Sequence, residues 1–167
     1  MKKIILLTAL FALHLGLAAQ INDANAEVRA ASGYHGINVS SAFNVYLSQG
    51  NEEAVAVSAA STKDRDMITV EVKDGILYIG LSKVWKWSNG NKKLRAYISF
   101  KQLNKLNISG ACDVFINGTI KSDVLRVEQS GASDLKGRLD VAKLTVQLSG
   151  ASDMTITGTA TRLNVEA

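Results

Sequence analysis

Apolar and polar residues alternate over most of this chain, which is the pattern of β-strands that bury one face. The alternation is clear over residues 37–47, 68–81 and 94–100, and no ten-residue stretch after residue 33 has helical periodicity. Lys73-Asp74-Gly75 separates two alternating runs, and an Asp-Gly pair in that position is typical of a tight hairpin. We therefore predict an all-β chain.

A five-residue motif recurs three times in the last third of the chain. The copies begin 21 and 19 residues apart (130 − 109 and 149 − 130), and an alternating apolar run precedes each one. Repeats of about 20 residues are typical of solenoids, whose units bury their apolar faces only by stacking. We predict a parallel β-helix-like solenoid with a looser N-terminal β part. The copies are Ser109-Gly110-Ala111-Cys112-Asp113, Ser130-Gly131-Ala132-Ser133-Asp134 and Ser149-Gly150-Ala151-Ser152-Asp153.

The first residues have the features of a signal peptide. Two lysines precede a short apolar run over residues 4–17, and small residues follow it. The run is too short to span a bilayer comfortably. We therefore expect an exported protein without a transmembrane segment, in the periplasm or on the outer surface of a Gram-negative bacterium. The predicted leader is residues 1–19, with a cut after Ala18 or Ala19, or as late as the small-x-small pattern that ends at Ala26.

The remaining chain is predicted to form one domain. Residues 20–32, rich in Ala, Asn and Asp, are expected to be a loose tail, and residues 33–167 a single β-solenoid domain. Its coils should be less regular over residues 33–103 and strictly repeated over residues 104–167. The sequence stops at Ala167, just before a fourth motif would fall. We expect either further residues in the natural protein or an open last coil that self-associates, because unpaired strand edges tend to pair.

Charge and cysteine content narrow the possible functions. The formal net charge of +4 is too small to indicate nucleic-acid binding, and no DNA- or RNA-binding motif is present. Cys112 stands where the other motif copies have serine, so we interpret it as a small turn residue. A nucleophilic cysteine would need a histidine partner, and after the leader the chain has only His35. We predict no catalytic residues and no cofactor.

The serines and aspartates of the motif allow two interpretations. If the repeats stack in register, the aspartates form a column, and carboxylates in a column could hold Ca²⁺. The favoured interpretation is structural: Ser and Asp side chains cap backbone N–H groups of their own turns. The residues concerned are Ser109, Asp113, Ser130, Asp134, Ser149 and Asp153.

The aromatic segment Trp85-Lys86-Trp87 is the candidate ligand-binding surface. It lies in a polar loop, and in an extended segment both tryptophans would point to one face. Aromatic platforms suit sugar rings and protein partners. We therefore expect host or cell-surface glycans or proteins as partners. The alternative is that the tryptophans cover the end of the solenoid or a neighbouring strand.

Several stretches together carry a resemblance to a known family. They are Gly33-Tyr34-His35-Gly36-Ile37-Asn38-Val39, Phe43-Asn44-Val45-Tyr46-Leu47-Ser48-Gln49-Gly50, Lys73-Asp74-Gly75-Ile76-Leu77-Tyr78-Ile79 and the repeated motif. As a set they resemble the head GIN domain family of Bacteroidetes, whose suggested role is that of autotransporter adhesins. The resemblance implies a fold similar to pectin-lyase-like β-helices without a recognised catalytic constellation. It also implies a non-enzymatic adhesion or ligand-binding module. The alternatives are a polysaccharide lyase or glycosidase on the same scaffold, and a structural spacer.

Overall fold

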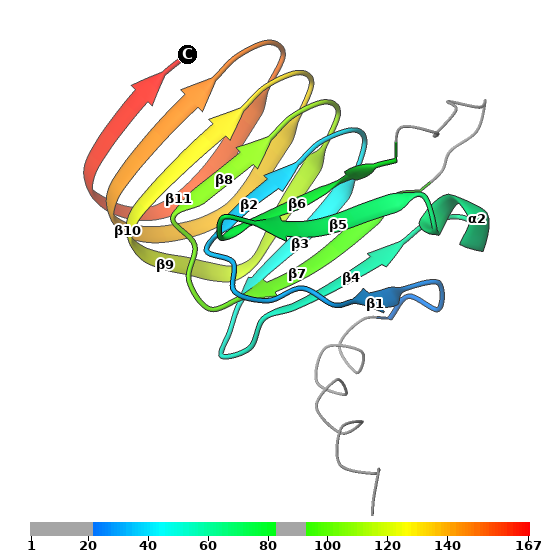
Figure 1. The fold of residues 1–167 in the computed structure, drawn as a ribbon. Helices are drawn as coiled ribbons and strands as arrows, with labels where there is room; N and C mark the ends of the chain where they lie inside the picture. The colour runs from blue at the N-terminus through cyan, green and yellow to red at the C-terminus, as the bar shows by residue number, and fades with distance from the viewer. Residues whose placement is uncertain (1–21, 83–92) are drawn as a thin grey trace, which may run out of the picture.

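The computed structural model describes residues 22–82 and 93–167, and nearly all regular structure in them is β-strand. Eleven strands form a single sheet, and a four-residue helix follows β4 (Figure 1). The predicted all-β fold is confirmed. Among the described residues, no helix has the length and hydrophobicity to cross a membrane. The elements are β1 (Glu27–Arg29), β2 (Gly36–Val39), β3 (Asn44–Gln49), β4 (Ala54–Ser58), α2 (Thr62–Arg65), β5 (Ile68–Lys73), β6 (Ile76–Leu81), β7 (Arg95–Phe100), β8 (Lys105–Ile108), β9 (Asp113–Gln129), β10 (Asp134–Leu148) and β11 (Asp153–Glu166).

The sheet folds back on itself into two facing walls because its longest strands are bent (Figure 1). In β9, residues 113–117 pair with β3 and residues 126–129 pair with β8. The first wall is β1-β4-β7-β3 and continues into the start of β9. The second wall is β5-β6-β2-β8 and continues into the end of β9. β10 pairs with β9 and β11 pairs with β10, so each of these strands also contributes to both walls.

The three C-terminal strands are parallel, and their motifs align. Asp113, Asp134 and Asp153 lie opposite one another at the start of β9, β10 and β11. The register between β9 and β10 shifts between Lys136 and Arg138, where the offset between partners changes from 21 to 19 residues (136 − 115 and 138 − 119). The unequal spacing of the motifs is therefore absorbed by an irregularity after the first wall, and the rest of each layer stays aligned.

Antiparallel strands end both walls on the N-terminal side. β4 pairs with β7 and β1, and β5 pairs with β6. The β5–β6 turn confirms the predicted hairpin, because Asp74 and Gly75 have φ angles of 51° and 73°, the left-handed values of a type I′ turn. The structure differs from two predictions. Residues 33–103 are not coils throughout, because β4 and β5 run antiparallel to their neighbours, and part of the predicted loose tail over residues 20–32 forms β1.

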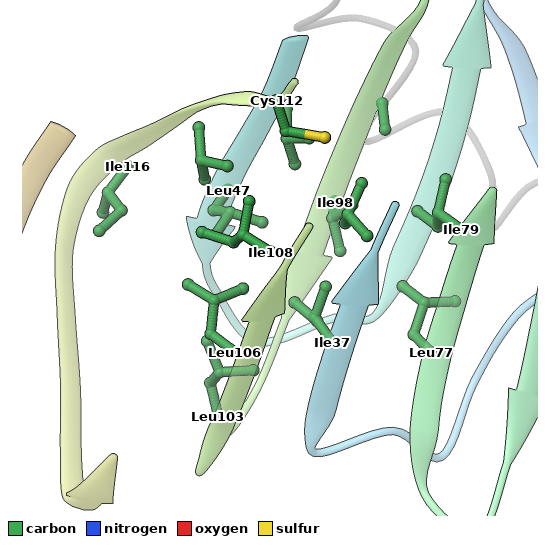
Figure 2. Close-up of a cluster of buried hydrophobic side chains, with 14 of the residues drawn as sticks. Ile37, Leu47, Leu77, Ile79, Ile98, Leu103, Leu106, Ile108, Cys112 and Ile116 are labelled. Atoms are coloured by element: carbon green, nitrogen blue, oxygen red, sulfur yellow. The ribbon is translucent and has the colours of Figure 1, made fainter. Parts of the chain in front are cut away.

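The space between the walls is filled by apolar side chains from both (Figure 2). Strand alternation places one side chain in two inside, and most of the inward residues of β2, β3, β6, β7 and β8 are at most 2% exposed. Tyr34, in the segment before β2, is the largest fully buried side chain among the described residues, and its hydroxyl donates to the carbonyl of Ser99 at 2.6 Å. Full burial of one such aliphatic side chain contributes about 1.5–3 kcal/mol to stability. Ile37, Leu47, Leu77, Ile79, Ile98, Leu106 and Ile108 are among those shown in Figure 2.

The interior reaches the surface at β11. Among the described strands, β11 pairs only with β10. Leu163 and Val165 align with the buried Leu144 and Val146 of β10, yet they are 59% and 52% exposed. A hollow of about 410 Å³, lined mostly by apolar side chains of β10 and β11, opens here.

Candidate functional site

The predicted contact residues Trp85, Lys86 and Trp87 lie outside the described residues, between the two described parts of the chain. The strands on either side of that gap are β6 in the second wall and β7 in the first wall. The role of the two tryptophans in ligand binding stays a prediction.

The repeated motif forms a corner at which the chain passes from the second wall to the first. Its backbone is bonded from layer to layer: Ala132 N donates to Gly110 O, and Ala151 N donates to Gly131 O, both at 2.8 Å. The glycines have φ angles of 77° to 87°, and a Cβ on Gly131 would lie closer than 3.0 Å to Gly110 O. Glycine is therefore required here both by conformation and by the close approach of the layers.

The side chains of the corner bond carbonyl groups. Ser133 Oγ donates to Ser130 O at 3.2 Å, and Ser152 Oγ donates to Ser149 O at 3.0 Å. Cys112 Sγ makes the same contact with Ser109 O at 3.4 Å. These side chains belong to the fourth residue of each motif and not to the residues predicted to cap N–H groups. Of the predicted residues, Ser109 donates through Oγ to Val39 O at 3.4 Å. Capping of N–H groups by the others stays a prediction. Burial raises the pKa of the Cys112 thiol, which fits a packed turn residue.

The aspartates form the expected column by register, on the outer side of the first wall. Asp113 and Asp153 are exposed, and Asp134 is half-buried with its Oδ2 3.2 Å from Lys136 Nζ. In the described parts of the chain, no three His, Cys, Asp or Glu side chains lie together in a way that could hold a metal ion. The calcium interpretation therefore has no supporting geometry in these residues.

The structure adds a fourth, earlier copy of the corner that the sequence comparison missed. Ser40-Ser41-Ala42-Phe43-Asn44 connects β2 to β3, and Asn44 aligns with Asp113. Ala111 N donates to Ser41 O at 2.7 Å, the same bond as in the later layers. Ser41 takes the glycine position with a φ of 94°. The sequence signal for this copy was Ser-x-Ala between two alternating runs. It was obscured because Ser41 stands at the glycine position of the motif and Phe43 stands where the later copies have a small residue.

An open groove of about 800 Å³ lies where the chain passes from the first wall to the second. Segments of β9, β10 and β11 contribute one residue each to a column in its lining, Lys121, Asp140 and Thr159, which are in register. The connection between β7 and β8 adds Lys101, and His35 lies at the same groove. The groove is within the size range of ligand sites but is lined mainly by polar groups.

Gln49 shapes the groove. β3 ends at Gln49, where the chain leaves the layered stack to enter β4. The Gln49 side chain bonds the backbone on both sides: Nε2 donates to Lys101 O and Lys121 O, each at 3.0 Å, and Oε1 accepts from Lys121 N at 2.7 Å. The side-chain amide therefore replaces the peptide group that a continuing strand would supply.

The groove offers charges of both signs. Asp140 Oδ1 accepts hydrogen bonds from Thr159 N and Thr159 Oγ1, both at 3.2 Å. Lys101 and Lys121 have no ion-pair partner among the described residues, and both are exposed. Their ammonium groups can therefore donate to a ligand, and amide and hydroxyl groups nearby can accept from it.

A second feature, on the outer side of the first wall, is a stack of three aromatic rings. Tyr97 stacks on Tyr46 with ring centroids 5.1 Å apart, and Tyr46 stacks on Phe115 at 5.5 Å. All three are half-buried. Because each ring covers the face of the next, little ring face is left for a sugar to stack on. We therefore interpret this stack as cross-strand stabilisation.

The aromatic stack ends at an ion pair with the N-terminal segment. Asp23 Oδ2 accepts from Arg95 Nη1 at 3.0 Å and from the Tyr97 hydroxyl at 2.9 Å. Burial alone would raise the pKa of Asp23, but the hydrogen bonds it accepts outweigh this and lower that pKa. Burial, together with the bond to Asp23, raises the pKa of Tyr97 to about 12.

Comparison with known proteins identifies the same family that the sequence resembled. The family model described as "Putative auto-transporter adhesin, head GIN domain" matches residues 33–167. Comparison with curated proteins finds no match.

Several solved structures share the fold. A putative adhesin from Bacteroides fragilis is 25% identical, with a TM-score of 0.75, over 85% of this chain and 69% of that one. A putative adhesin from Parabacteroides distasonis is 18% identical, with a TM-score of 0.71, over 84% of this chain and 64% of that one. A "putative lipid binding protein" from Parabacteroides distasonis is 21% identical, with a TM-score of 0.60, over 83% and 63%. With residues 33–167 matched by the family model, the chain belongs to the head GIN domain family.

Proposed function

We propose that this chain is an exported, non-enzymatic binding module that acts in adhesion, in the periplasm or at the outer surface of the cell. Family membership supports this role, as does the similarity to structures described as putative adhesins. We also propose that residues 104–167 are a parallel β-helix-like solenoid, which the in-register parallel pairing of β9, β10 and β11 supports.

The observation that carries the proposal is the groove at the bends. It is lined by Lys101 and Lys121, which have no ion-pair partner in the described parts of the chain, and by hydroxyl and amide groups beside them. A hydroxyl-rich ligand offers both donors and acceptors to such a surface, so we assign the groove to a cell-surface glycan. A rigid stack of layers holds these groups in fixed positions, which reduces the entropy lost on binding.

The test is binding of the exported protein to a glycan array, with Lys121→Glu as the groove variant. Hydrogen bonds to a charged group contribute about 1.5–3 kcal/mol, so we expect binding to weaken by at least about tenfold. Lys73→Glu is the matched control, because Lys73 is exposed on the β5–β6 hairpin. Binding that is unchanged in Lys121→Glu would contradict the groove assignment.

Two further arms separate the remaining alternatives. Loss of binding in a Trp85→Ala/Trp87→Ala variant, with Lys121→Glu unaffected, would move the site to the tryptophans. Loss in the presence of a calcium chelator alone would indicate a metal-dependent site. A lyase or glycosidase would shorten the bound glycan and lower its mass. Because we propose a non-enzymatic module, we expect the mass of the glycan to be unchanged after incubation.

A further inference from the structure

The N-terminal segment is folded onto the edge of the first wall. Residues 23–29, which we term the N-terminal clasp, include β1, whose three residues pair antiparallel with β4. The side chain of Asp23 is only 8% exposed, and its partners Arg95 and Tyr97 belong to β7. The clasp therefore contacts two strands of the wall, β4 and β7. It lies before residue 33, where the match to the family begins.

A tight turn connects Asp23 to β1. Asn25 N donates to Asp23 Oδ1, and Ala26 N donates to Asp23 O, both at 3.0 Å. Arg65, at the end of α2, donates through Nη1 to Asn25 O at 3.1 Å and pairs through Nη2 with Glu27 at 2.7 Å. The turn is thus bonded within itself and to a helix about forty positions later in the chain.

This turn contains the later of the two possible leader cleavage sites, the one that ends at Ala26. A cut there would remove Asp23 and leave Arg95 and Tyr97 without their acceptor. It would also leave β1 as the first residues of the mature chain, with no anchor before it. β4, which β1 covers, has the sequence Ala54-Val55-Ala56-Val57-Ser58 without any charge. If β1 then separated from it, β4 would be an uncharged edge strand, and such edges promote association between molecules.

We infer that the leader is cut before Asp23, after Ala18 or Ala19, so that the N-terminal clasp is part of the mature protein. This inference rests on the export that we propose above. A leader is discarded on export, whereas Asp23 accepts hydrogen bonds from Arg95 and Tyr97 of β7, and Asn25 O accepts one from Arg65 of α2. The proposed cut keeps all of those contacts and the cover over β4.

The test is the N-terminus of the full chain after export from a Gram-negative host, determined by N-terminal sequencing and intact mass. We expect Ala19 or Gln20 as the first residue. A first residue of Glu27 would overturn the inference. An uncut chain would overturn both the inference and the export, whereas the expected cut without glycan binding would contradict only the binding function.

Two variants give independent checks. Ala26→Leu removes the small residue that cleavage at the later site requires, so we expect the same N-terminus and yield as for the natural sequence. Failure of processing in this variant would contradict the inference. In the protein recovered after export, Asp23→Ala should lower the melting temperature by several degrees. Glu71→Gln, an exposed change on β5, is the control. Equal melting of Asp23→Ala and the natural sequence would show that the clasp is not part of the fold.

Discussion

The two ends of the stacked layers meet solvent in different ways. At the N-terminal end, the outermost strands are β1 and β5, which are short and antiparallel to their neighbours. β1 carries Glu27 and Arg29, paired with each other at 2.6 Å, and β5 exposes Glu71 and Lys73. At the other end, β11 presents fourteen residues, with the aliphatic side chains of the interior exposed.

This difference shows that the parallel and the antiparallel strands have different structural roles. Each parallel layer forms its backbone hydrogen bonds with the next layer. The stack is therefore regular, but its last layer has N–H and C=O groups with no layer to pair with. The antiparallel strands turn the chain back and carry charges, which are common protection against edge-to-edge pairing. The less regular N-terminal half therefore forms the ends of the two walls. The regular C-terminal half, β9 to β11, lines the groove.

The strongest way to break the parallel half is to separate its layers at the corner. Gly131→Val should destabilise the protein by about 3 kcal/mol or more, because valine is strained at a φ of 86° and its Cβ meets Gly110 O. Gly118→Val is the matched control, since Gly118 has the same φ of 86° with no atom within 4 Å of the added Cβ. Chemical denaturation measures both, and equal losses would show that layer contact is unimportant at the corner.

The exposed end offers the next largest effect. For a chain that ends at Ala167, we expect copies to self-associate through β11, because Leu163 and Val165 expose apolar surface and β11 pairs only with β10 among the described strands. Leu163→Lys/Val165→Lys should raise the dissociation constant about tenfold or more, measured by light scattering over a range of concentrations. Val72→Lys, an exposed apolar residue on the charged β5 edge, should change it little. A chain that stays monomeric at high concentration would contradict this expectation.

At the boundary between the two halves, Gln49 should have a moderate effect. Gln49→Leu removes three hydrogen bonds to the backbone of the groove, and we expect a loss of about 1–2 kcal/mol because water replaces part of them. Hydrogen exchange at the Lys121 amide should become faster. Gln102→Leu, which also lies at the groove, is the control. Unchanged protection of that amide would contradict the bridging role.

The smallest effect is expected at Cys112. Cys112→Ser converts the corner to the form found in the next two layers, where serine hydroxyls donate to the carbonyl of the first motif residue. We expect a change in the free energy of unfolding of less than about 1 kcal/mol. Phe43→Ser at the equivalent position of the earlier layer should cost about 3–5 kcal/mol, because a buried ring is lost.

The features that the sequence predicted correctly have local or periodic signals. Asp74-Gly75 specifies its hairpin through two residues, and strict alternation indicates strands wherever it lasts. β1 was missed because three residues are too few to show alternation, and its pairing partner lies almost thirty positions later. The groove was missed because it depends on where β3 leaves the stack. No residue pattern near Gln49 predicts that its side-chain amide will bond the backbone of Lys121, seventy-two positions later.

The register shift beside Lys136 has a consequence for how such a protein can change during evolution. Two residues are gained or lost between one layer and the next without any disturbance at the corner, where the motifs remain aligned. We therefore expect insertions and deletions to be tolerated better on the side of the molecule that carries the groove than at the corner. Homologous proteins could acquire new specificities by changing the length of single layers there, while the shared corner keeps the architecture constant.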